Sequence, residues 1–178
     1  MNLFILRHAS AGTRRANPLL DVKRPLDKEG KRHCLQLAHV LNASKIQFDL
    51  IVSSNLKRSL QTASLVGTET GYESAIQISN ALAPEATLHD FQRLLDTCRD
   101  HENVLVVGHN PNINNFLGSL LVPATSHGPA QVRLRKGSLA RLSFARGTAT
   151  LQWLLDPRTI RALYVTSTKS SRRKTSRK

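Results

Sequence analysis

Apolar and polar residues follow one another in blocks that predict strands alternating with helices. The first block, Leu3 to Leu6, is a continuous apolar run that stops at Arg7 and His8, as expected of a buried strand that leads into a loop. Similar short runs predict further strands at residues 49–54 and 103–109, and residues 76–78 predict a weak, short strand between them.

The segments between these runs place apolar residues every three or four positions, which is typical of helices that pack one face on a sheet. Asp27 is expected to cap the first helix, whose inward residues include Cys34, Leu35, Ala38 and Leu41. The helices are predicted at residues 27–42, 55–71, 84–99 and 110–121, with Pro84 opening the third and Asn110 capping the fourth before Pro111. Residues 9–25 show no periodicity and predict a long loop.

Two alternating segments, 138–145 and 148–155, flank Arg146-Gly147 and predict a hairpin near the end of the chain. Strands that alternate with helices favour a parallel sheet. The fold class expected is therefore α/β: a three-layer sandwich with a mostly parallel central sheet, flanking helices and a C-terminal antiparallel hairpin.

The chain of 178 residues carries a net charge of +14, and the excess is uneven. Residues 167–178 hold six cations and no acid, and the remainder still carries +8. We expect one domain over residues 1–160 and a basic, disordered tail over residues 161–178. A basic body favours anionic partners such as phosphorylated molecules, acidic proteins or nucleic acid.

Composition narrows these alternatives. Aromatic residues make up 4% of the chain, which argues against stacking platforms for bases. Cys34 and Cys98 lie far apart with no metal-ligand spacing, so we expect reduced thiols, no metal and no cofactor. The N-terminal apolar run is too short for a signal peptide or a membrane span, so a cytoplasmic protein is expected.

Polar side chains that could act on a phosphoryl group follow the predicted strands. The carboxyl ends of parallel strands share one edge of the sheet, so Arg7 and His8, Ser54 with Arg58, and His109 should meet there. A neutral His8 could attack phosphorus while its other ring nitrogen donates to a backbone carbonyl. Arg7 and Arg58 could clamp the phosphoryl oxygens, and His109 could donate to the same oxygens.

These motifs resemble a known family. Leu-Arg-His at 6–8, Ser-Ser-x-x-x-Arg-x-x-x-Thr at 53–62 and Val-Gly-His-Asn-Pro at 107–111 look like the histidine phosphatase superfamily, in particular its small phosphohistidine phosphatase (SixA-like) branch. Arg-Pro-Leu at 24–26 is similar to that branch as well, and the resemblance covers about residues 1–156. It implies a fold of the phosphoglycerate mutase type, a phosphorylated His8, and Arg7, Arg58 and His109 around the phosphate.

Ser54 is a substrate-binding candidate, and three further residues complete the expected site. Larger members of the family use a carboxylic acid at a helix start after the third strand, and Glu85 matches that place, with capping of the helix as its structural alternative. Asp21 is a second acid candidate and a substrate-binding candidate, and Arg24 either contacts phosphate or pins the loop. Ala9 stands where the family name-giving motif has glycine, a costly change if the backbone there needs positive φ.

The leading hypothesis is a metal-independent phosphatase that works through phospho-His8, on phosphohistidine in a protein. Hydrolysis of a small phosphorylated metabolite is the first alternative. The second is a phosphate- or nucleic-acid-binding protein that acts through its basic tail, with weak polyanion contact there. The remaining histidines are expected at solvated or helix-surface positions: His33, His39, His89, His101 and His127.

Overall fold

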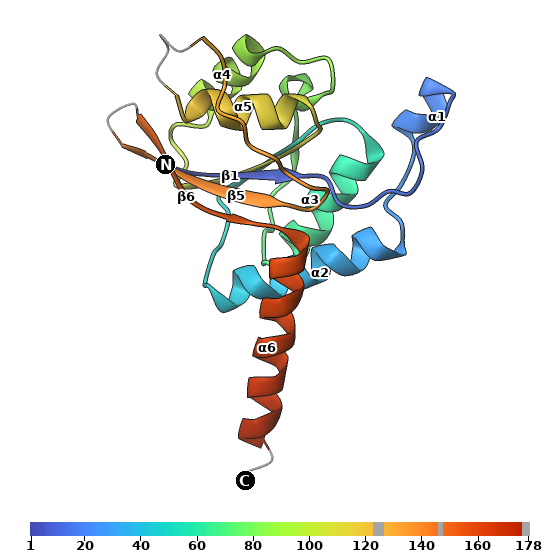
Figure 1. The fold of residues 1–178 in the computed structure, drawn as a ribbon, viewed down its shortest axis with the longest axis vertical. Coiled ribbons are helices and arrows are strands. Elements are labelled where there is room, and N and C mark those ends of the chain that lie inside the picture. The colour runs from blue at the N-terminus through green and yellow to red at the C-terminus, as the bar shows by residue number, and fades with distance from the viewer. Residues whose placement is uncertain (123–126, 146–147, 176–178) are drawn as a thin grey trace.

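A computed structural model describes residues 1–122, 127–145 and 148–175 of the chain. Elements are numbered along the chain, with η1 a single 3₁₀ turn (Figure 1). They are β1 Asn2–Arg7, α1 Pro18–Val22, α2 Lys28–Ala43, β2 Leu50–Ser53, α3 Lys57–Glu69, β3 Gln77–Ile78, η1 Asn80–Leu82, α4 Leu88–Thr97, β4 Asn103–Gly108, α5 Asn112–Leu120, β5 Leu139–Ala145, β6 Thr148–Leu155 and α6 Pro157–Thr175.

Within the described residues, six strands form one sheet in the order β3-β2-β4-β1-β5-β6. β1 pairs in parallel with β4, and β4 pairs in parallel with β2, whereas β5 runs antiparallel to β1 and carries β6 at the edge. The expected α/β sandwich with a mostly parallel sheet and a C-terminal hairpin is confirmed. The hairpin turn, Arg146-Gly147, lies outside the described residues.

The first apolar run is a strand buried on both faces. Phe4 and Leu6 join the core beneath α2, α3 and α6, whereas Leu3 and Ile5 join the core beneath α4 and α5. Figure 1 shows α4 and α5 on one side of the sheet and α2, α3 and α6 on the other. Successive side chains of a strand point to opposite faces, so a continuous apolar run serves two cores at once.

The predicted start of α2 is confirmed. Asp27 caps this helix, and its carboxylate accepts the N–H of Gly30. Gly30 is needed because a Cβ there would overlap the backbone carbonyl of Ser10, which crosses close to the helix. Leu35, expected to face inward, is 45% exposed instead, and the neighbouring Leu37 is buried.

Two predicted helix starts are wrong, because side chains find other partners. α4 begins at Leu88, and Thr87 and Asp90 form a capping box, so neither Pro84 nor Glu85 opens the helix. α5 begins at Asn112, and no side chain caps its start. The side-chain amide of Asn110, the predicted cap, donates instead to the backbone carbonyl of Leu134.

The segments expected to be without structure also differ. The loop over residues 9–25 contains α1, which begins after an Asn17 cap with Pro18 in its first turn. Helix α6, Pro157–Thr175, includes residues 161–175 of the segment expected to be a disordered tail. α6 starts on Asp156, which accepts the N–H groups of Arg158 and Thr159, and Ile160 anchors it in the core. Residues 176–178 lie outside the described part.

Candidate active site

The strand order brings the predicted site residues together. β1, β4 and β2 are neighbours in the sheet, with Arg7 opposite Gly108 and Ser53 opposite Val107. The residues that follow these strands, His8, His109 and Ser54, therefore emerge side by side at one edge. The ring centroids of His8 and His109 lie 4.9 Å apart.

One nitrogen of His8 is committed to the backbone. Nδ1 lies 2.8 Å from the carbonyl oxygen of Ala9, and a carbonyl can only accept, so Nδ1 carries the proton and donates. Nε2 is then left with its lone pair. Burial lowers the pKa of His8 to about 3, and Arg58 and Arg7 add to this shift by repelling a charged ring. His8 is thus a neutral imidazole at physiological pH.

The backbone that supports His8 is itself held from two sides. Thr62 accepts the N–H of Ala9 at 3.1 Å and donates to the carbonyl of Arg58 at 2.7 Å, so it links the His8 loop to α3. Thr62 follows Arg58 by four residues and lies on the same face of α3, which is the sequence signal for this link. Among non-glycine residues in the described part, only Lys45 has positive φ, so Ala9 carries no strain of that kind.

His109 is oriented by Ser54, whose Oγ lies 2.6 Å from Nε2. The Nδ1 atom of His109 is buried and has no hydrogen-bond partner among the described residues. Burial lowers its pKa to about 2, and the positive neighbours act in the same direction. Ser54, predicted as a substrate-binding residue, thus contacts His109 directly.

Arg58 is buried, Arg7 is partly buried, and both are incompletely paired. Arg58 is 6% exposed, and its Nη1 donates to the backbone carbonyl of Asp21 at 3.0 Å. Arg7 donates from Nη1 to the carbonyl of Leu134 at 2.8 Å. Nε of each arginine is buried without a partner. A buried donor without a hydrogen-bond partner lowers the stability of the folded protein. An oxyanion beside His8 could accept hydrogen bonds from the two guanidinium groups and the His109 ring, so the site is suited to an oxyanion.

Asp21 and Arg24 hold the loop that passes over Arg58. The Arg24 side chain donates to Asp21 at 2.8 Å and to the carbonyl of Ala11 at 2.7 Å, which is the loop-pinning role considered for it. The hydrogen bond from Arg24 lowers the pKa of Asp21 to about 2. Asp21 therefore stays ionised and is a poor proton donor, and its carboxylate also lies 3.4 Å from Arg58.

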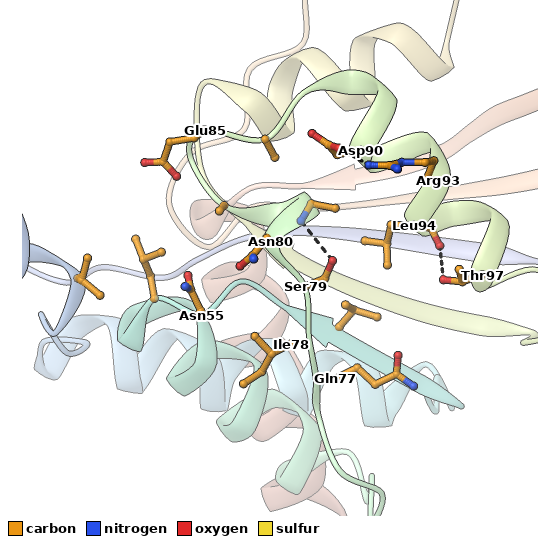
Figure 2. Close-up of a pocket in the computed structure, with 16 residues that line it drawn as sticks. Asn55, Gln77, Ile78, Ser79, Asn80, Glu85, Asp90, Arg93, Leu94 and Thr97 are labelled. Carbon is orange, nitrogen blue, oxygen red and sulfur yellow. Dashed lines mark hydrogen bonds and ion pairs between the residues drawn. The ribbon is translucent and has the colours of Figure 1, made fainter.

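Glu85 lies apart from this cluster, exposed in the turn before α4. It lines a cavity of about 860 Å³ that we call the edge pocket, together with Asn55, Ile78, Ser79 and Asn80. Figure 2 shows Glu85 at the rim, with the side chains of Ser79 and Asn80 further in. Asn55 follows Ser54 directly, so the edge pocket adjoins the His109 side of the site.

Residues 133–137 complete the site and were not predicted. Leu134 accepts from both Arg7 and Asn110, and the N–H of Gly137 donates to the carbonyls of Arg7 and His8. His33, expected at a solvated position, is half-buried, with Nε2 3.0 Å from the carbonyl of Gly137. These contacts join distant segments that lack periodicity, and the sequence carries no local signal for them.

A family model described as histidine phosphatase superfamily (branch 1) matches residues 3–86, the segment that contains Arg7, His8 and Arg58. This part of the chain is therefore similar to the histidine phosphatase superfamily. An uncharacterised protein of Picosynechococcus sp. is 28% identical over 155 residues, which cover 85% of this chain and 89% of that protein.

Solved structures share the histidine phosphatase fold with this chain. The protein histidine phosphatase SixA complexed with tungstate has a TM-score of 0.79 at 23% identity, covering 90% of this chain and 99% of that one. The alpha-ribazole phosphatase from Shigella flexneri has a TM-score of 0.69 at 19% identity, covering 88% and 97%. With 88–90% of this chain covered, the likeness in fold extends beyond the residues that the family model matches.

Cys34 and Cys98 are buried free thiols, and burial raises the pKa of Cys34 to about 12. Among the described residues, His, Cys, Asp and Glu side chains form no group of three or more that could hold a metal ion.

None of the helices in the described ranges is long and apolar enough to cross a membrane.

Proposed function

We propose that the protein is a histidine phosphatase that removes the phosphoryl group from phosphohistidine in a protein and carries it transiently on Nε2 of His8. The contact between His8 Nδ1 and the carbonyl of Ala9 carries the proposal, because it leaves Nε2 with a lone pair in a ring that stays neutral. Arg7, Arg58 and His109 supply the donors around it. The SixA structure, which shares this fold, holds tungstate, itself a tetrahedral oxyanion.

The reaction balances in two steps. First, Nε2 of His8 bonds to phosphorus, and the bond between phosphorus and the substrate imidazole breaks. A substrate ring that is protonated on its other nitrogen leaves as neutral imidazole and needs no acid from the enzyme. Water then attacks phospho-His8, which releases inorganic phosphate and restores neutral His8.

The three groups around His8 have distinct roles in this proposal. Arg7 and Arg58 offer fixed positive charge to the phosphoryl oxygens in both steps. If the Ser54 hydroxyl donates to Nε2 of His109, Nδ1–H of that ring is free to donate to the same oxygens. Asp21 holds Arg58 and Arg24, and Glu85 remains the candidate acid for substrates with poorer leaving groups.

The surface beside the site favours a protein substrate. α1 projects from the body, and its Leu19 and Leu20 are 77% and 58% exposed (Figure 1). Val22 is also exposed and lines the edge pocket next to Asn55. Apolar side chains gathered beside a catalytic centre are typical of a protein contact surface. A small metabolite would leave these side chains in water.

A substrate panel in the presence of a metal chelator tests this proposal. We expect a phosphohistidine protein to be hydrolysed with a kcat/KM about 100-fold or more above that of a phosphoserine peptide or a sugar phosphate, because its leaving group is better and its surface contacts α1. Comparable or higher kcat/KM on a small metabolite would favour the alternative substrate class. Loss of activity on chelation would overturn metal independence.

The acid side of the pH profile should reflect the lowered pKa of His8. An ordinary histidine would be protonated as the pH falls through about 6.5. Here the pKa is about 3, so the nucleophile stays neutral and kcat/KM should hold between pH 7 and pH 5. Measured with a chromogenic aryl phosphate and corrected for the titration of that substrate, a decline centred near pH 6.5 would contradict the assignment.

A further inference from the structure

A second cavity opens on the other side of the site, next to Arg7. It measures about 420 Å³, and we call it the basic cleft. Its walls come from α2, from residues 133–136 and from α6, and Figure 1 shows α2 and α6 side by side. Six cations line it: Arg7, Arg32, Arg133, Arg135, Lys136 and Arg161.

The charge of the basic cleft is almost uncompensated. Among the described residues that line it, Glu29 is the only acid, and it lies 3.9 Å from Arg161. The edge pocket has the opposite balance, because Glu85 and Asp90 line it with one arginine, Arg93, which is paired with Asp90. The two cavities that flank the phosphoryl site therefore differ in sign.

The basic cleft is connected to the phosphoryl site through the backbone. The N–H of Gly137 donates to the carbonyls of Arg7 and His8, and His33 on α2 holds the carbonyl of Gly137. Lys136 and Arg7 both repel a proton on His8, which places the edge of the cleft close to the nucleophile. A substrate whose phosphoryl group reaches His8 must place neighbouring atoms near these cations.

We propose that the basic cleft binds carboxylate side chains that the phosphoprotein substrate carries beside its phosphohistidine. This inference rests on the proposed function and deepens it. The cleft is larger than one phosphate needs, and its cations stand on four separate segments, as suits several carboxylates. The described residues that line it include no Phe, Tyr or Trp on which bases could stack, which favours an acidic protein over nucleic acid.

A charge-reversal pair tests the cleft against a matched control. The cleft variant is Arg32→Glu with Arg161→Glu, and the control is Lys31→Glu with Lys45→Glu, which changes net charge equally at exposed positions outside the cleft. Each enzyme is assayed on a phosphohistidine peptide with acidic flanks, on the same peptide with neutral flanks, and on phosphoramidate.

We expect the kcat/KM of the wild-type enzyme to be about tenfold higher on the acidic peptide than on the neutral one, through a lower KM. The preference should decrease at high salt, because salt screens the interaction between exposed charges. The cleft variant should lose this preference and keep its turnover of phosphoramidate, whereas the control should keep the preference. Equal behaviour of the cleft variant and the control, or a wild-type enzyme indifferent to the flanks, would overturn the inference.

Failure of the proposed function gives a different result. If wild-type enzyme hydrolyses phosphoramidate but neither peptide, the proposed substrate class is wrong. The cleft is then tested by direct binding of an unphosphorylated acidic peptide, for which we expect at least tenfold weaker affinity in the cleft variant than in the control. Cleft-dependent binding of a single-stranded oligonucleotide without binding of the acidic peptide would overturn the choice of occupant.

Discussion

Replacing His8 with glutamine is expected to lower kcat by about four orders of magnitude or more, because the proposed nucleophile is removed. Glutamine is similar in size to histidine, and its amide can still donate to the carbonyl of Ala9, so the loop should keep its place. What is lost is the lone pair of Nε2. The measurement is steady-state release of phosphate from a phosphohistidine protein and from phosphoramidate.

The matched control for this variant is His89→Gln on the exposed surface of α4, which should retain wild-type turnover. Both proteins should unfold at temperatures close to that of the wild type, so that a loss of activity is not a loss of fold. Turnover of His8→Gln within about tenfold of wild type would exclude His8 as the nucleophile.

The second large effect is expected at Arg58. Its guanidinium is buried, one nitrogen is held by the backbone of Asp21, and Nε has no partner. Arg58→Lys keeps the positive charge but loses the planar pair of donors, so kcat should fall about 100-fold. Arg58→Ala removes the charge as well, and its kcat should fall about tenfold further.

The effect at Arg58 should lie in kcat more than in KM, because negative charge on the phosphoryl oxygens is stabilised most in the transition state. Arg99→Lys, in an exposed ion pair with Asp96 at the end of α4, is the matched control and should be neutral. A KM increase with unchanged kcat in Arg58→Lys would show that Arg58 binds substrate without stabilising the transition state.

The centre of the site could be predicted because it depends on signals that are local in sequence. A short apolar run that ends in Arg7 and His8 is typical of a buried strand, and the run that ends at His109 is of the same kind. The alternation of strands with helices then favours a parallel sheet, in which the carboxyl ends of these strands lie at one edge. The Asp27 cap is local in the same sense.

Other features depend on contacts between distant segments, and the sequence patterns gave no access to them. Asn110 has the residue type and position of a helix cap, yet its side-chain amide donates a hydrogen bond to the backbone carbonyl of Leu134. The sequence pattern places His33 on a solvated helix face, but in the fold this face contacts the backbone of Gly137. The role of Asp21 as a partner of Arg24 and Arg58 likewise follows from the loop path and not from spacing.

The most direct test of the central claim is to look for the phosphoryl group on His8 during turnover. Enzyme mixed with a phosphohistidine protein is quenched in alkali, which preserves phosphohistidine, and the peptide that contains His8 is sequenced by mass spectrometry. We predict a phosphoryl group on His8 whose rates of formation and decay are at least as high as kcat. The His8→Gln variant should carry no such group. Steady turnover with His8 unmodified throughout, or a label on another residue that keeps pace with turnover, would contradict the account.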